Sequence, residues 1–189
     1  MANMFTDTGR VEEAVPLLRE TLRSNPSHAE AHWELGYAYR FAGALEESVR
    51  ECERARQLDP GVKLNSSMLN SYLYLGQYDK FLNSLPNDQD LSLIVFYRGF
   101  GEYYLGDLNQ STSNFDRAFD LDPSLLQAQI GKALSFGAKQ QPHAGLSILR
   151  AAEKRINERG VSEAEGIYKI AQAYAILGDS TSALRVLRQ

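Results

Sequence analysis

Two histidines are the first residues whose spacing could support chemistry. His28 and His32 lie four residues apart in HAEAHWE, a spacing that would bring both imidazoles to one face of a helix, as a metal pair requires. They flank an expected helix start after Asn25-Pro26, however, and no third ligand is nearby in the sequence. We therefore predict a structural, solvated role for the pair and no metal site. His143 follows Pro142 at another expected helix start and is given no role.

Other candidates for chemistry are also better explained by structure. Cys52 is the only cysteine, so the chain can form no internal disulfide, and its apolar surroundings predict a buried, inert thiol. The segment RGFGEYYLG resembles a glycine-rich loop, but no strand pattern precedes it, so close packing of helices is the better interpretation. No phosphate-binding, nucleophile-elbow or zinc-protease motif is present. The sequence predicts no catalytic residue and no cofactor, and an enzyme is not expected.

The composition is that of a folded chain with a mild negative charge. The 189 residues are 43% hydrophobic and 23% charged, and the net charge is -4 without a cluster of basic residues. A nucleic-acid partner is therefore not expected. No apolar run approaches the roughly 18 residues of a membrane span, and the first residues lack the pattern of a secretion signal. We expect a cytoplasmic location, with no membrane span.

A repeated turn signal organises the whole chain. Gly9, Gly43, Gly76 and Gly106 follow one another at intervals of 34, 33 and 30 residues, and Gly178 comes two repeats later. In the repeat between Gly106 and Gly178, Gln140 takes the place of the turn glycine. Five residues after the turn a small side chain recurs, and nine residues after it an apolar one. These spacings place a stripe on one side of a helix, with small residues where two backbones approach. The pattern predicts helix pairs that end at glycine and then at proline.

The segment Ala31 to Pro60 resembles a tetratricopeptide repeat in almost every position, with Leu35, Gly36, Tyr39, Gly43, Ser48, Ala55 and Pro60 at the positions that define such a repeat. The resemblance covers nearly the whole chain and implies an all-α, right-handed superhelical solenoid of antiparallel helix pairs, roughly 75% helical. The chain is loosely similar to the tetratricopeptide modules of bacterial multidomain proteins.

The repeats define one domain over residues 1–189. We expect a partial repeat at 1–28, full repeats at 29–62, 63–91, 92–125 and 126–163, and a truncated repeat at 164–189. Because neither end resembles a polar cap, the chain is expected to be a fragment of a longer protein.

The resemblance also implies that the first helix of each pair lines a concave groove. Its expected residues are Trp33, Tyr37, Arg40, Phe41, Tyr74, Phe96, Tyr97, Phe100, Tyr103, Tyr104 and Tyr168. An exposed aromatic surface of this size is typical of a binding site. The groove would bind an apolar protein or peptide segment, with Arg40, Lys63 and Lys169 contacting acidic groups on it. Alternatively, several of these rings turn sideways and fill gaps between helices.

A protein- or peptide-binding scaffold is the leading functional hypothesis. Chaperone acidic C-terminal tails are not expected as partners, because the clamp positions of that subtype hold Trp33, Tyr37, Ser67, Leu93 and Tyr97. Two alternatives stay open: a homo-oligomerisation module, for instance a homodimer, and a regulatory domain attached to a missing catalytic or DNA-binding domain.

Overall fold

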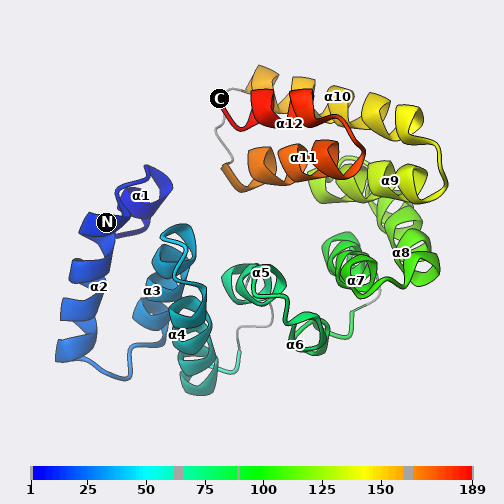
Figure 1. Cartoon of the computed structure of the whole chain (residues 1–189). Coiled ribbons are helices and arrows are strands. Elements are labelled where there is room, and N and C mark those ends of the chain that lie inside the picture. Colours follow the sequence, from blue (N-terminus) through cyan, green and yellow to red (C-terminus); the bar gives the residue numbers. More distant parts are fainter. Residues whose placement is uncertain (1, 62–65, 89, 160–163, 189) are drawn as a thin grey trace. The chain divides into compact units, whose positions relative to one another are not determined.

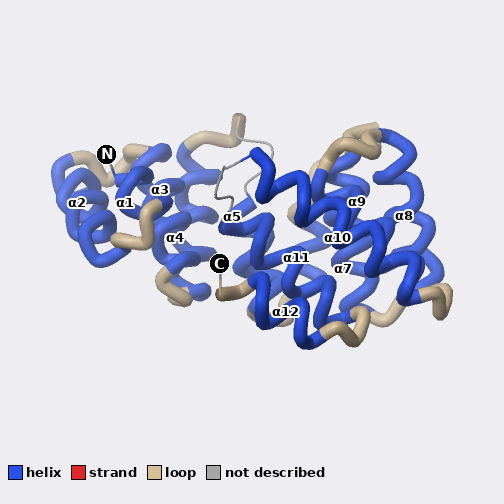
Figure 2. The backbone as a smooth tube through the Cα atoms, turned by 90° about the horizontal axis from the view of Figure 1, so that it is seen from above, coloured by secondary structure: helices blue, strands red, loops and turns tan. Residues whose placement is uncertain are grey.

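The structure is a computed structural model that describes residues 2–61, 66–88, 90–159 and 164–188. Helices make up 79% of the described residues, and no strand occurs among them (Figure 2). The all-α fold predicted from the repeat is therefore confirmed. The chain divides into two compact units, residues 1–86 and 87–189, which are described separately below.

The first unit contains three helix pairs (Figure 1). They are α1 (Ala2–Asp7) with α2 (Val11–Ser24), α3 (Ala29–Phe41) with α4 (Leu45–Leu58), and α5 (Ser66–Tyr74) with α6 (Tyr78–Asn83). Each of α1 to α5 packs against the next helix along the chain, and α3 also contacts both α1 and α5. The three odd-numbered helices thus form one layer.

The second unit repeats this arrangement. Its pairs are α7 (Ser92–Leu105) with α8 (Leu108–Leu121), α9 (Leu126–Ala138) with α10 (Pro142–Arg159), and α11 (Ala164–Ile176) with α12 (Ser180–Val186). Here α9 contacts both α7 and α11, so the first helices of the pairs again share a layer.

The turn inside each pair has the backbone conformation that the repeat predicts. All five predicted turn glycines have positive φ, and Gln140 is the only other described residue that does, with φ 60°. At Gly106 the N–H groups of Gly106 and Asp107 reach back to Tyr103 and Glu102. Gln140 and Gln141 make the equivalent bonds to Gly137 and Phe136. This pattern ends a helix with a left-handed residue and satisfies its last carbonyl groups. The prediction that Gln140 takes the glycine's place is confirmed.

The small residues of the repeat lie where helices touch. A Cβ atom at Gly36 would come within 2.5 Å of Cys52 Sγ, and one at Gly145 within 2.5 Å of the Ala133 carbonyl oxygen. A Cβ atom at Gly99 would lie 3.0 Å from Phe115 and 3.1 Å from the Ser111 carbonyl oxygen, so this glycine of RGFGEYYLG serves helix packing, as expected, whereas Gly106 forms the turn. Contacts this short leave no room for a larger side chain.

The structure describes the predicted repeats at 63–91 and 126–163 only in part. Helix α6 has 6 residues and α10 has 18, so the second helices of these two pairs differ in length. Lys63, residues 160–163 and Gln189 lie outside the described residues.

Candidate functional site

The aromatic residues expected to line a groove in the second unit are largely buried. Phe96, Tyr97 and Phe100 are at most 2% exposed. Within the unit the ring of Phe115 on α8 lies 5.9 Å from Phe96 and 6.4 Å from Phe100, centroid to centroid. The expectation that these three rings face an open groove is wrong, and the alternative that rings fill gaps between helices is correct for them.

A glycine on the neighbouring helix explains this burial. Gly131 of α9 leaves a gap in which an added Cβ would lie 2.7 Å from Phe115 and 3.1 Å from Phe96. Large rings on α7 and α8 therefore occupy the space that a side chain on α9 would otherwise take.

Side chains of α11 contact the aromatic residues of α7. Lys169 is 1% exposed, and its Nζ atom lies 5.7 Å from the Tyr97 ring centroid and 5.5 Å from that of Phe100. Gln172 Nε2 donates a hydrogen bond to Tyr104 Oη at 2.5 Å. Lys169 was expected to contact acidic groups on a ligand. That expectation is wrong, because the side chain is buried among rings of its own unit.

The remaining predicted groove residues of the second unit are partly accessible. Tyr103 and Tyr104 are half-buried, and Tyr168 is 45% exposed. Tyr103 lines a hollow of about 310 Å³ with Leu134 and Ile176, among others. Tyr168 lines another, of about 380 Å³, beside Leu184 and Leu187 of α12.

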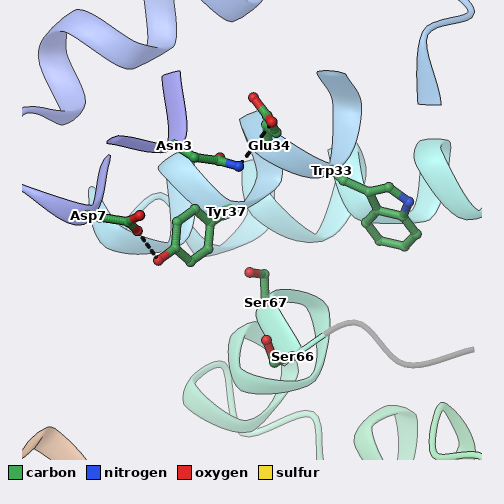
Figure 3. A pocket seen from close by; sticks show the side chains of 7 residues that line it. All are labelled: Asn3, Asp7, Trp33, Glu34, Tyr37, Ser66 and Ser67. Carbon is green, nitrogen blue, oxygen red and sulfur yellow. Dashed lines mark hydrogen bonds between the residues drawn. The ribbon is translucent and has the colours of Figure 1, made fainter. Parts of the chain in front are cut away.

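The first unit has an open hollow on its layer of odd-numbered helices. It has a volume of about 350 Å³ and lies between α1, α3 and α5 (Figure 3). We call it the α3 hollow from here on. Its lining residues are Asn3, Asp7, Trp33, Glu34, Tyr37, Ser66 and Ser67. Trp33 and Tyr37 are predicted groove residues, and both are half-buried here. A concave hollow with aromatic side chains and a few placed polar groups has the usual character of a binding site.

Hydrogen bonds hold the two carboxylates of the α3 hollow. Tyr37 Oη donates to Asp7 Oδ1 at 2.7 Å, and Asn3 Nδ2 donates to Glu34 Oε1 at 3.0 Å (Figure 3). Burial raises the pKa of Glu34, the negative charge of Glu30 raises it further, and the bond from Asn3 opposes the shift. The hollow therefore holds a carboxylate that has lost part of its hydration.

Trp33 forms the other end of the hollow. Its indole extends from α3 on the side away from Tyr37 (Figure 3). The Nε1 atom is buried and has no hydrogen-bond partner among the described residues.

The other predicted groove residues of the first unit lie beside the hollow rather than in its lining. Arg40 packs its guanidinium 4.5 Å from the ring centroid of Phe41 and 5.5 Å from that of Tyr37. Phe41 is 38% exposed, and Tyr74 on α5 is half-buried.

Sequence reasoning missed Asn3 and Asp7. Both belong to α1, which was interpreted only as the first helix of the partial repeat at 1–28. Glu34, Ser66 and Ser67 occupy inward positions of the repeat, but an aromatic criterion does not select them.

The histidines and the cysteine that were considered for chemistry make contacts within the fold. His28 Nδ1 accepts the Ala31 N–H at 3.3 Å and begins α3. His32 lies within hydrogen-bond distance of Glu51 and Pro26, so it is structural but not fully solvated. Burial raises the pKa of Cys52 to about 12, which keeps the thiol protonated near neutral pH. Among the described residues no group of three or more His, Cys, Asp or Glu could hold a metal ion.

None of the helices in the described ranges has the length and apolar character needed to cross a membrane.

Comparison with known proteins matches the N-terminal part of the repeat region to a family. Residues 2–62 match the family model of the tetratricopeptide repeat. Cellulose synthase operon protein C of Escherichia coli K12 is 36% identical over 72 residues, which is 38% of this chain and 6% of that protein. The chain thus spans only a small part of this curated relative.

Solved structures share the fold at low sequence identity. The Cut9-Hcn1 hetero-tetramer of the APC/C has a TM-score of 0.74 at 13% identity, covering 99% of this chain and 38% of that one. MamA from Desulfovibrio magneticus RS-1 has a TM-score of 0.65 at 18% identity, covering 86% and 93%. A tetratricopeptide repeat protein from Parabacteroides merdae has a TM-score of 0.60 at 19% identity, covering 99% and 75%.

The fold is that of an array of stacked helix pairs, the class of scaffold that generally mediates contacts between proteins. The tetratricopeptide repeat predicted from the sequence is thus matched over residues 2–62, and the solved structures share the fold of the chain.

Proposed function

We propose that the chain is a non-catalytic scaffold that binds a protein or peptide segment, and that the α3 hollow of the first unit receives it. The observation that carries the proposal is the hollow itself, in which three helices bring two aromatic side chains and two carboxylates to one open surface. Aromatic anchors bury large area with little loss of side-chain entropy, which suits a peptide-binding surface.

Blocking the hollow tests the proposal. Ser66 lines the hollow and is exposed, so Ser66→Phe should fill it without disturbing the core. Peptides selected from a displayed random library on the full chain should lose at least about tenfold in affinity for this variant. Ser113→Phe, on an exposed position of α8, is the matched control and should bind within about twofold of the parent chain. Equal affinities for both variants, or a library that enriches no peptide, would refute the proposal.

Self-association is the second candidate function, and one observation favours it. The last helix pair presents Tyr168, Leu184 and Leu187 to solvent around one hollow. A second copy could cover this apolar surface. If it does, the mass measured by light scattering should rise with concentration, and Leu184→Ser should keep the chain monomeric. A constant monomer mass for the parent chain would rule this function out.

A further inference from the structure

The lining of the α3 hollow has an unbalanced charge. Asp7 and Glu34 are acidic, and the other described residues of the lining are uncharged. Glu30, one turn before Glu34 on α3, adds a third negative charge close enough to raise the Glu34 pKa. The chain's amino terminus and His28 act on the Glu34 pKa in the opposite direction, and Arg40 packs against Phe41 and Tyr37, but none of these three groups belongs to the lining. The charge of the lining itself is therefore wholly negative.

From this charge and shape we infer that the partner presents a basic side chain, lysine or arginine, which enters the α3 hollow between Asp7 and Glu34. The inference rests on the proposed function and specifies the chemistry of the partner segment.

The two carboxylates are positioned before any ligand binds. Asp7 is held through Oδ1 by the Tyr37 hydroxyl, and Glu34 through Oε1 by the Asn3 amide. Each of these bonds engages one oxygen of a group that can accept several hydrogen bonds. Charge-assisted bonds from an ammonium or guanidinium group to such fixed carboxylates are stronger than bonds between neutral groups, and little ordering is needed to form them.

The aromatic side chains suit the rest of a basic residue. The alkyl stem of a lysine or arginine packs on apolar surface while its charged end stays polar. Trp33 and Tyr37 provide that surface at the two ends of the hollow (Figure 3). Cations are also attracted to ring faces, and Arg40 beside Tyr37 shows this contact within the chain itself.

The surroundings of Glu34 favour a cationic group on the partner. Its carboxylate is partly desolvated and lies close to the like charge of Glu30. An ammonium or guanidinium group at this position would relieve both costs, because it pairs with the partly desolvated charge. An acidic peptide would instead add a further like charge and is disfavoured.

Four peptides that differ at one position test the inference. Capped nonapeptides with central lysine, arginine, glutamine or glutamate, and the same leucine, alanine and serine flanks, are titrated against the full chain by calorimetry. We expect the lysine and arginine peptides to bind at least about tenfold more tightly than the glutamine peptide, and the glutamate peptide to bind most weakly.

Charge variants link the preference to the hollow. In Asp7→Asn/Glu34→Gln the four affinities should converge to within about threefold. The matched control, Glu46→Gln/Asp120→Asn, removes two charges from exposed positions on α4 and α8 and should keep the full preference. Glu34→Gln alone should lose part of the preference, and circular dichroism checks that each variant is folded.

Each other result overturns the inference. Equal affinities for the four peptides, or tighter binding of the glutamate peptide, would do so while leaving the proposed function intact. A preference that survives in Asp7→Asn/Glu34→Gln would place the basic side chain elsewhere. If none of the four peptides binds, the inference fails, and the library selection with Ser66→Phe decides the proposed function independently.

Discussion

The Tyr37 hydroxyl donates to the Asp7 carboxylate at 2.7 Å and so joins α3 to α1 across 30 residues of sequence. The bond places the negative charge of Asp7, from α1, in the lining of the α3 hollow, to which α3 contributes Trp33, Glu34 and Tyr37. Asp7 lies two residues before the turn glycine Gly9, as Phe41 does before Gly43, so the same position of the repeat carries a charge in one helix pair and a ring in the next. The predictions below follow from such contacts.

Removing the charge of Glu34, which is half-buried, should not cost stability. Burial and Glu30 raise its pKa in the folded chain, so the folded state favours the protonated form. A group with a raised folded pKa stabilises the fold at low pH, and this contribution is lost as pH rises through the folded value. Near pH 7, Glu34→Gln should therefore leave the free energy of unfolding unchanged or raise it. Urea titration measures this, and a loss above about 1 kcal/mol would show that Glu34 has a mainly structural role.

Phe100 should behave as a core residue. It is 2% exposed and packs against Phe96, Phe115 and Lys169. Phe100→Ala should lower the free energy of unfolding by roughly 3–5 kcal/mol. Tyr168→Ala, at a 45% exposed position, is the control and should change it by about 0.5 kcal/mol or less. Similar melting temperatures for the two variants would contradict the burial described here.

The turn at Gln140 should be improved by glycine. Its φ of 60° lies in the left-handed region, where a side chain is strained and glycine is not. Gln140→Gly should raise the free energy of unfolding by up to about 1 kcal/mol, whereas Gly178→Ala, at the equivalent turn with φ 85°, should lower it. Chemical denaturation of both variants checks the signs. A destabilised Gln140→Gly would mean that the glutamine side chain contributes more than the strain costs.

The carboxylate of Glu153 should make the second unit sensitive to acid. Its Oε2 atom accepts hydrogen bonds from the Tyr174 hydroxyl and from Arg185 Nη2, each at 2.9 Å. The bond from Arg185, against the opposing effect of burial, holds the Glu153 pKa below its usual value of 4.5. A lowered folded pKa contributes stability above the unfolded value, and the contribution is lost as pH falls through the folded value.

At pH 7 Glu153→Gln should therefore cost about 1–3 kcal/mol, as expected for hydrogen bonds to a charged group. The difference from the parent chain should shrink as pH falls below about 4.5. A difference that is constant with pH would show that the charge of Glu153 contributes nothing. Glu158→Gln, at an exposed position of the same helix, serves as the control.

Much of the fold could be predicted because the repeat encodes it locally. The turn residues Gly106 and Gln140 have the same backbone conformation since both end a helix at the same point of the repeat. The spacing of Ser48 and Ala55 placed small residues in helix contacts, and both are fully buried.

The site was predicted less well because it depends on contacts between repeats. Periodicity identifies the inner face of α7 but does not show that Lys169 and Gln172 of α11 cover it. Likewise, the sequence shows Asp7 near a turn, and only the packing of α1 on α3 brings it to Tyr37.

The emission of Trp33 tests the central claim most directly. Trp33 is the only tryptophan in the chain and lines the α3 hollow, so its fluorescence reports on that surface alone. A library-selected peptide that contains no tryptophan is titrated against the full chain, and calorimetry provides its affinity separately. The account predicts a saturable change in emission with the calorimetric dissociation constant, absent in Ser66→Phe. Full binding by calorimetry with unchanged Trp33 emission would place the partner elsewhere and contradict the account.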